Sequence, residues 1–539
     1  MARFPQELYD QICGYLPSEA LRRVSYVSTA FRKSAEDQAG MYRTRDHEIS
    51  TDIRLDKFIN YYSGFRLRYL RHVQLDVRFP DPEDEDRGCR ESAKEQYQRD
   101  MTFTEQVRMI FETLQVIEDR AGERNRGNYQ LTICVNCYVD EYCLHRQHAQ
   151  WRTHLLESKS LPKLMSVTSL QILNETTSAK LDYPILIDLG KQLPNLEDLE
   201  CHMGQDEWTP SYSEEPASLF VWEYDGPRRD TRHDFSKALT SNMNQRVRRV
   251  DLDFLCRGAM MEADRINHCT AMPNLASPFS KDPFSSSLRI MSYHLREMTI
   301  RAQVDETLFW PGDGSAPHWP YLEYVFLLFH TVSPSGAWYF EGPRGEGRQS
   351  TGYEIDSSSY PPMETTEDDE MSGCQDVEND RSFQYQVQFW YRISPNERVL
   401  APFLESFAKA AAHMPELKRA VVWSPLRWDV DGDSNRGPAF DYFEPPKTFY
   451  PDYSAWGFAY YAPGPGSPFA TNPGETDCKA RQIWWKVGDW RPSVGLHSAF
   501  QQIGFHKYGE ELKEYWDDDE FGNGLVSRDY FERFTRQDY

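Results

Sequence analysis

The stretch LPNLEDLEC, from Leu193 to Cys201, decides the fold class of this chain. Its apolar residues Leu196, Leu199 and Cys201 follow the spacing apolar-x-x-apolar-x-apolar. The alternation of the last two with polar neighbours is typical of a β-strand that buries one face. The proline between Leu193 and Leu196 favours a turn before the strand. The stretch therefore predicts a turn that leads directly into a short strand.

The same spacing recurs along the body of the chain. The other copies are Leu70/Val73/Leu75, Val167/Leu170/Ile172, Val247/Val250/Leu252, Leu295/Met298/Ile300, Leu322/Val325/Leu327 and Leu417/Ala420/Val422. Helical patterns lie between some copies, and they cover Phe103–Ile117, Asp234–Thr240 and Ala401–His413. Helices that alternate with strands predict an α/β fold with parallel strands.

A strand introduced by an upstream leucine resembles the opening of a leucine-rich repeat, whose usual period is about 20–29 residues. The resemblance implies a solenoid of short parallel strands and helices. Successive copies from Val167 begin 29, 51, 48, 27 and 95 residues apart, so the predicted array is irregular. An ordinary α/β or α+β fold with many short strands is the alternative.

The first forty residues predict three short helices. The first helix carries an apolar stripe formed by Phe4, Leu8, Ile12, Tyr15 and Leu16. Pro5 suits its first turn and Pro17 ends it, while Ser18 and Ser28 are candidate N-caps of the next two helices. A unit this small buries too little surface to be stable alone. Its apolar stripe therefore needs a partner, which is either the following domain or another protein.

Residues 4–37, FPQELYDQICGYLPSEALRRVSYVSTAFRKSAED, resemble an F-box. The matching residues are Pro5, Glu7, Leu8, Ile12, Leu16, Pro17, Leu21, Val27, Ser28, Phe31 and Arg32. Phe4 replaces the usual leucine, and no tryptophan follows the third helix, where Met41 and Tyr42 stand instead. The resemblance implies that the module binds a Skp-family adaptor, which links it to a cullin scaffold, and that it catalyses nothing. The docking residues it implies are Phe4, Pro5, Leu8, Ile12, Leu16, Leu21, Val27 and Phe31.

We expect three parts along the chain: an F-box over 1–45, the repeat-like region over 46–455, and an aromatic-rich C-terminal cap region over 456–539. Acidic inserts are expected near 81–100 and 356–382. Such runs are usually solvated loops, and a second reading is that they screen or attract basic target segments. The C-terminal region, together with Ser333–Gly347, is similar to an uncharacterised region of fungal F-box proteins.

The expected function is that of a substrate-recruiting adaptor of a Skp–cullin–F-box ubiquitin ligase, with a target protein of unknown identity on the concave face of the repeats. One alternative is an F-box-like protein in a ligase-independent assembly. Another is an enzyme in the C-terminal region.

Composition narrows the possible partners and compartments. A net charge of −24 repels nucleic acid and anionic membrane surfaces, so neither is expected as a partner. No stretch approaches the length of apolar sequence that a membrane span needs. Ten scattered cysteines suit free thiols in a reducing compartment, and we expect a cytoplasmic or nuclear protein.

Two motifs could carry chemistry and one basic cluster could read a phosphorylated motif, and we expect none of them to do so. Cys134, Cys137, Cys143, His145 and His148 could hold zinc, but strand alternation would point the first two sulfurs to opposite faces. GPRGEG, residues 342–347, lacks the following helix that a phosphate loop requires, and predicts a turn. RVRR, residues 246–249, is the only compact basic cluster, and its alternation predicts the solvent face of a strand. No metal, cofactor or catalytic residue is therefore predicted.

Overall fold

The computed structural model describes residues 5–38, 47–49, 55–79, 88, 90–135, 151–174, 180–203, 222–240, 245–255, 268–367, 369, 391–427, 454–464, 479–509, 511–516, 526–528 and 530–531. Within these ranges, no helix combines the length and the apolar character that crossing a bilayer requires.

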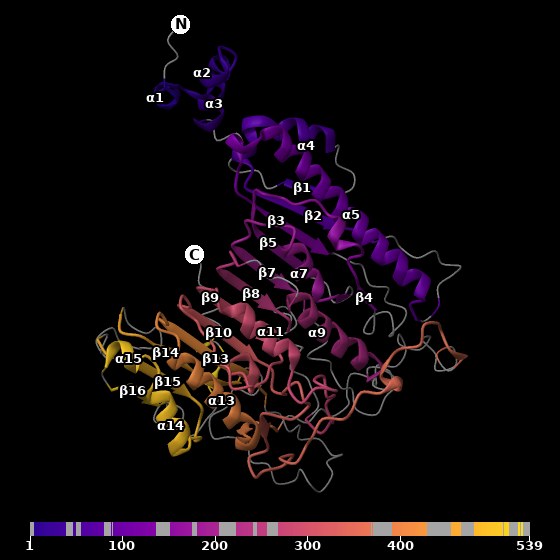
Figure 1. Ribbon diagram of the computed structural model, residues 1–539, viewed down its shortest axis with the longest axis vertical. Coiled ribbons are helices and arrows are strands. Elements are labelled where there is room, and N and C mark those ends of the chain that lie inside the picture. Colours follow the sequence, from indigo (N-terminus) through magenta and orange to yellow (C-terminus); the bar gives the residue numbers. More distant parts are fainter. Residues whose placement is uncertain are drawn as a thin grey trace.

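One large sheet runs through the body of the chain (Figure 1). Its strands, in order across the sheet, are β1 (His47–Ile49), β2 (His72–Val77), β3 (Tyr129–Val135), β5 (Val167–Asn174), β7 (Asp198–His202), β8 (Arg249–Asp253), β9 (Glu297–Ala302), β10 (Tyr324–Phe329), β13 (Arg419–Leu426), β14 (Ser454–Tyr461), β15 (Gln482–Lys486) and β16 (Lys513–Trp516). All neighbours from β1 to β13 are parallel. The predicted α/β class with parallel strands is therefore confirmed.

The C-terminal strands change direction. β14 is antiparallel to both β13 and β15, β16 is parallel to β15, and β17 (Val526–Ser527) pairs with β14. Two small sheets lie apart from the large one and are formed by β4 (Arg152–Thr153) with β6 (Lys180–Leu181) and by β11 (Phe340–Glu341) with β12 (Ser394–Pro395).

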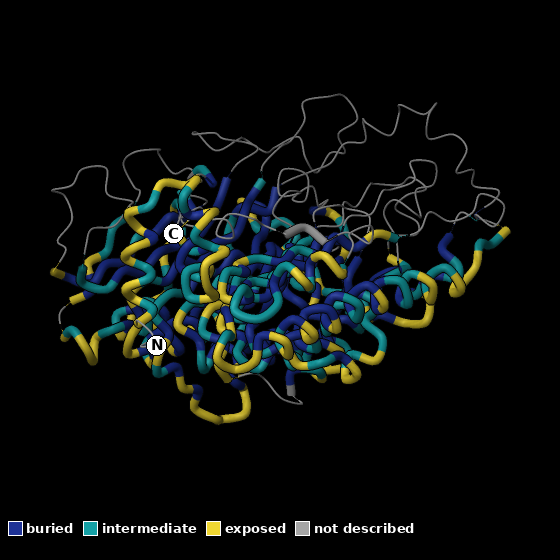
Figure 2. Tube along the Cα trace, turned by 90° about the horizontal axis from the view of Figure 1, so that it is seen from above, coloured by how far each residue is buried: buried dark blue, intermediate teal, exposed yellow. Residues whose placement is uncertain are grey.

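The helices of the body pack on one face of the sheet (Figure 1). They are α4 (Leu55–Tyr62), α5 (Ala93–Ala121), α7 (Pro184–Gly190), α9 (Asp225–Thr240), α11 (Pro283–Ser292), α13 (Glu397–Ala412), α14 (Val494–Gln501) and the short α15 (Phe505–Tyr508). Apolar residues of α4 through α14 share a single core with the inward side chains of the strands. Figure 2 shows the buried residues gathered in the interior and the exposed ones around it. The strands also follow one another in chain order, unlike a doubly wound sheet, in which the order reverses.

The recurring motif forms two continuous rows of buried side chains across the sheet. One row is Val73, Leu131, Leu170, Leu199, Val250, Met298, Val325 and Ala420, and the other is Leu75, Ile133, Ile172, Cys201, Leu252, Ile300, Leu327 and Val422. All seven predicted copies are therefore strands in one register. Burying each such side chain stabilises the fold by roughly 1.5–3 kcal/mol before entropy is counted.

Irregular spacing reflects long crossovers and not missing strands. Although 95 residues separate Leu322 from Leu417, β10 and β13 are hydrogen-bonded neighbours. Part of this crossover, including Val332 and Trp338, packs on the face of the sheet that the helices leave open.

Local chemistry defines both ends of α5. The Ser92 hydroxyl accepts from the backbone N–H of Glu95, and the Glu95 carboxylate accepts from the Ser92 N–H at 2.7 Å. This capping box satisfies two helix-end donors. Gly122 ends the helix with a φ of 67°. Because α5 begins at Ala93, the acidic insert predicted near 81–100 extends too far into the helix.

The C-terminal end of α5 is fixed to the next strand through Glu118. Its carboxylate accepts from the backbone N–H groups of Met165 at 2.7 Å and Ser166 at 2.9 Å, and from the Tyr129 hydroxyl at 3.1 Å. An amide offers one acceptor oxygen where the carboxylate offers two. We therefore expect Glu118→Gln to lower the free energy of unfolding by about 1–3 kcal/mol, measured by urea denaturation. Glu112→Gln on the exposed face of α5 should change it by less than about 0.5 kcal/mol. Equal effects of the two substitutions would contradict this account.

The three predicted N-terminal helices are present as α1 (Gln6–Gly14), α2 (Ser18–Val24) and α3 (Thr29–Gln38). The Ser28 hydroxyl accepts from the Phe31 N–H at 3.2 Å, as an N-cap does. Ser18 is the first residue of α2 and not its cap, because Pro17 takes that position. The module has its own small core of Cys13, Leu21 and Ala35, separate from that of the body.

Two polar contacts attach this module to the body beside α4 (Figure 1). The guanidinium of Arg66 meets the carboxylate of Glu36 at 2.7 Å, and the Tyr69 hydroxyl donates to the backbone oxygen of Lys33 at 3.0 Å. Arg66 and Tyr69 belong to a 3-10 helix, Gly64–Tyr69. The C-terminal half of α3 is therefore held on the body, and α1 and α2 lie on its far side (Figure 1).

Candidate protein-binding surfaces

The N-terminal module exposes large apolar side chains. Of the predicted docking residues, Leu8 is 41% exposed, Ile12 46% and Val27 68%, and Pro5 is exposed as well. Leu8 and Ile12 lie one turn apart on α1 and therefore share a face. Isolated exposed apolar residues are normal on a protein, but several on a unit of 34 described residues indicate a contact surface.

Two exposed aromatic residues were missing from the predicted docking set. Tyr15 is 90% exposed on the same face of α1 as Ile12, and Tyr26 is 78% exposed in the turn before α3. Tyr15 belongs to the apolar stripe read from the sequence, so that stripe was the signal that could have found it. Nothing in the local pattern distinguishes Tyr26. Tyrosine is enriched in protein interfaces, so both extend the candidate surface.

Three residues of the predicted docking set are buried or half-buried in the module. Leu21 is only 6% exposed and belongs to the module core, so the prediction of a surface position for it is wrong. Leu16 and Phe31 are half-buried and pack against that core. These side chains shape the module from inside because three short helices need a common apolar centre. Phe4 lies outside the described residues.

A second candidate surface is the face of the sheet opposite the helices. Across the first strands its side chains are polar and form the row Gln74, Thr132, Gln171, Glu200, Asp251 and Thr299. Neighbours in this row hydrogen-bond, as where Thr132 donates to Gln171 at 3.0 Å. Arg301 meets Asp251 at 2.7 Å. Thr132 and Arg301 are buried on this face, whereas the other side chains of the row are partly exposed.

The rest of this face is covered by the chain itself. Leu328, Val421 and Trp423 continue the face on β10 and β13, and they form a second core with Trp338 and Phe531. The rings of Trp423 and Phe531 stack with centroids 5.3 Å apart. Among the described residues, the polar strands β2 to β9 are the part of this face that the second core leaves uncovered.

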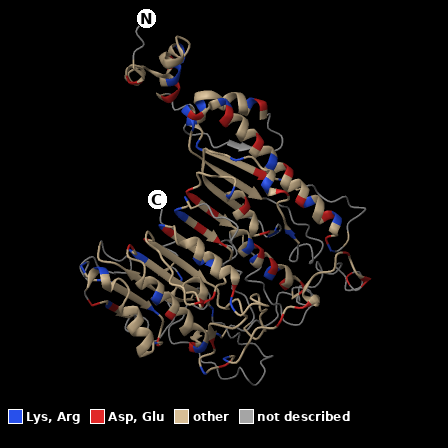
Figure 3. Ribbon diagram, in the orientation of Figure 1, with Lys and Arg blue, Asp and Glu red and all other residues tan. Residues whose placement is uncertain are grey.

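Basic residues are dispersed among acidic ones. Figure 3 shows both signs of charge interspersed along α5. In the predicted basic cluster, Arg246 and Arg249 are exposed, as expected for a solvent face. Arg249 is paired with Asp198 on the neighbouring strand at 2.6 Å. This pairing neutralises part of the cluster.

Part of one predicted acidic insert, near 356–382, lies in the described part of the chain. Residues 356–367 and Asp369 are described, and Asp369 is buried against Arg90 at 2.7 Å. Burial alone would raise the pKa of Asp369, but the hydrogen bonds from Arg90 and Thr366 outweigh it and lower that pKa to about 2. Arg90 also meets Glu223 at 2.5 Å. The first half of the insert therefore braces the start of α5. Residues 81–86 of the other predicted insert lie outside the described residues.

The motifs considered for chemistry give no site in the described part of the chain. Cys134 is a buried free thiol, whereas Cys137, Cys143, His145 and His148 lie outside the described residues. No group of three or more metal-ligating side chains occurs among the residues that are described. GPRGEG is a turn in which the Gly345 N–H donates to the Gly342 oxygen, as predicted.

His154 lies between two carboxylates on the helical side of the sheet. It meets Asp100 at 3.3 Å and Asp182 at 3.8 Å. Burial works against its charge, but the hydrogen bond to Asp100 and the charge of Asp182 raise the pKa of His154. Asp100 also accepts from the His154 N–H, and Asp182 accepts from Thr231. These contacts join α5, α9 and the small β4/β6 sheet. His154 therefore helps to hold these elements together.

No model of a known protein family matches this chain, and no curated protein sequence matches it significantly.

Proposed function

We propose that this chain is a substrate-recruiting adaptor of a Skp–cullin–F-box type ubiquitin ligase. The observation that carries the proposal is the concentration of exposed apolar side chains on the N-terminal module, led by Leu8, Ile12 and Tyr15. The resemblance of residues 4–37 to an F-box supplies the partner. An apolar helical surface suits a stable interface with a Skp-family adaptor.

The body is proposed to be an irregular leucine-rich-repeat-like solenoid that holds the target. Parallel strands in chain order, helices on one face and two continuous apolar rows support this proposal. The polar strand face from β2 to β9 would contact the target protein. Holding that target near the ubiquitin-charged enzyme raises its effective concentration, and the chain itself makes no bonds.

The test is a pull-down of a purified Skp-family adaptor with the full chain and with a Leu8→Asp/Ile12→Asp variant. Two carboxylates on the apolar face of α1 should weaken binding roughly 100- to 1000-fold, because each residue would be buried in the interface.

Val494→Asp is the matched control. Val494 is 89% exposed and stands in the first turn of α14, where a carboxylate is tolerated. The control should bind as the unmodified chain does. Equal binding by all three proteins would remove α1 from the interface. Binding of the adaptor without recruitment of the cullin scaffold would favour a ligase-independent assembly.

A further inference from the structure

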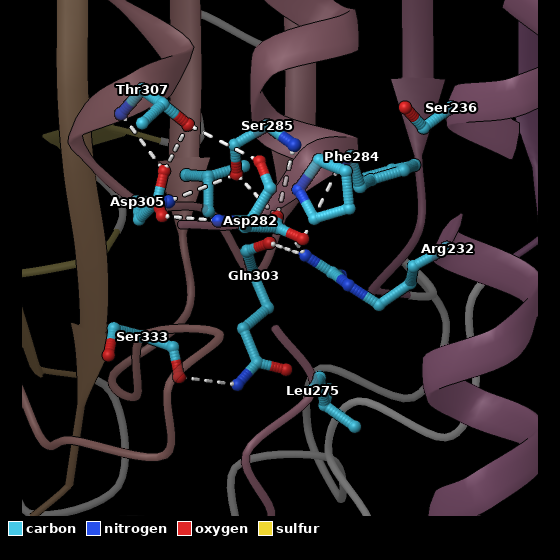
Figure 4. A network of polar contacts seen from close by, with 12 residues as sticks. Arg232, Ser236, Leu275, Asp282, Phe284, Ser285, Gln303, Asp305, Thr307 and Ser333 are labelled. Carbon is cyan, nitrogen blue, oxygen red and sulfur yellow. Dashed lines mark hydrogen bonds and ion pairs between the residues drawn. The ribbon is translucent and has the colours of Figure 1, made fainter. Parts of the chain in front are cut away.

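A cluster of buried charged groups joins three segments at the centre of the body (Figure 4). Arg232 comes from α9, Asp282 is the N-cap of α11, and Asp305 precedes a 3-10 turn at Glu306–Leu308. Arg232 and Asp282 are fully buried, and Asp305 is 7% exposed. Buried charges are costly unless a group of opposite sign lies beside them.

Asp282 has such a partner. Its Oδ2 accepts from the Arg232 guanidinium at 2.6 Å and from the Ser285 hydroxyl at 2.6 Å. Its two carboxylate oxygens also accept from the backbone N–H groups of Phe284 and Ser285, which start α11. The charge of Asp282 is therefore balanced by Arg232 and spread over helix-end donors.

Asp305 lacks a cation. Its carboxylate accepts from the Asp282 N–H at 2.9 Å and from the N–H and hydroxyl of Thr307 at 2.9 and 2.5 Å. In the described part of the chain, no basic side chain lies within ion-pair distance of it. The cluster thus contains two carboxylates for one guanidinium. An ionised Asp305 would therefore lie buried beside a second carboxylate, with no cation of its own among the described residues.

The neighbouring charged groups are engaged elsewhere. Arg289 of α11 donates to the Thr307 backbone oxygen at 2.6 Å. Lys281 is 54% exposed and pairs with Glu306 at the surface. Burial lowers the pKa of His233, whose ring meets the Leu275 oxygen. The Tyr339 hydroxyl donates to the Val304 oxygen at 2.8 Å.

We propose that the chain folds around a bound proton: Asp305, buried beside the ion-paired Asp282, takes up one proton on folding and releases it on unfolding. The charge imbalance of the buried cluster carries this inference, because burial beside a second carboxylate outweighs the three hydrogen bonds that favour the ionised form of Asp305. The inference does not depend on the proposed function. In agreement, burial and the charge of Asp282 raise the pKa of Asp305 from its ordinary value of 3.8 to about 7.

A proton bound only by the folded state makes the free energy of unfolding depend on pH. Between pH about 4 and pH about 7 the folded state holds a proton that the unfolded state has lost, so stability falls as the pH rises. The contribution of Asp305 to the unfolding equilibrium constant should increase by roughly tenfold per pH unit through this window and then level off. Through this group, mild acidification therefore raises the free energy of unfolding.

The experiment is urea unfolding of the full chain at a series of pH values, followed by tryptophan fluorescence, for the unmodified chain and for Asp305→Asn. The ratio of their unfolding constants should change roughly tenfold per pH unit below about pH 7. Asp234→Asn, which removes a carboxylate that is 50% exposed, should keep the pH profile of the unmodified chain. Parallel profiles for the unmodified chain and Asp305→Asn would overturn the proposal.

Thr307→Val keeps the proposal testable if Asp305→Asn does not fold. Valine has nearly the same shape as threonine but removes the hydroxyl that donates to Asp305. That hydroxyl favours the ionised carboxylate, so its loss should move the level-off point to higher pH. An unchanged level-off point in this variant would contradict the presence of the bound proton.

Discussion

Asp282→Ala is expected to lower the free energy of unfolding by about 3–5 kcal/mol, because it leaves Arg232 buried without the carboxylate that it contacts at 2.6 Å. The same substitution removes the N-cap of α11, which alone contributes roughly 1 kcal/mol. Urea denaturation of the full chain measures the change.

Asp234→Ala on α9 is the matched control for this prediction. Asp234 also forms an ion pair, with Lys237 at the next turn, but both side chains are at least half exposed. Exposed pairs on a helix contribute only about 0.3–0.5 kcal/mol. If the two substitutions destabilised the chain equally, the buried cluster would not hold α9 against α11.

Phe407→Ala is expected to cost about 3–5 kcal/mol, through lost burial and the cavity left behind. Phe407 lies on α13, and its ring centroid is 5.1 Å from Phe309, 5.2 Å from Phe458 and 6.0 Å from Phe500. It therefore joins the repeat-like region to β14 and α14, which belong to the C-terminal region. Loss of this ring should therefore lower the local stability of both regions.

Hydrogen exchange of the full Phe407→Ala chain tests this coupling. Protection should fall in β10 and in β15 alike, because one core spans both. Glu405→Ala on the exposed side of α13 should leave the pattern unchanged. Loss of protection confined to residues 456–539 would show that this region is a separate cap.

The central sheet could be predicted because its signal is local. Each motif copy carries its own turn, its own buried pair and its own alternation, as Leu196, Leu199 and Cys201 illustrate. β3 is not a copy of the motif, since Asn128 holds the position where the motif has an apolar residue. The register of the rows then follows from burying one face.

α11 was missed because its serines obscure the apolar face, although Asp282 and Pro283 are an ordinary helix start. The buried cluster could not be found in the sequence at all. Arg232 and Asp282 are 50 residues apart, and each occurs in a segment that looks like solvated surface.

The candidate docking surface was predicted only in part. Leu8 and Leu21 both fit the family pattern, and no local property separates them. Their exposed fractions, 41% and 6%, depend on how three short helices meet around Cys13. Sequence spacing predicts a shared stripe, whereas the packing of the three helices decides which members of it stay accessible.

The most direct test of the central claim is a calorimetric titration of a purified Skp-family adaptor into the full chain. We expect saturable binding with one adaptor per chain. We expect the heat of binding to disappear when the Leu8→Asp/Ile12→Asp variant is titrated. No heat from a folded chain, confirmed as folded by its urea transition, would contradict the claim and leave residues 5–38 as a helical cap of the body.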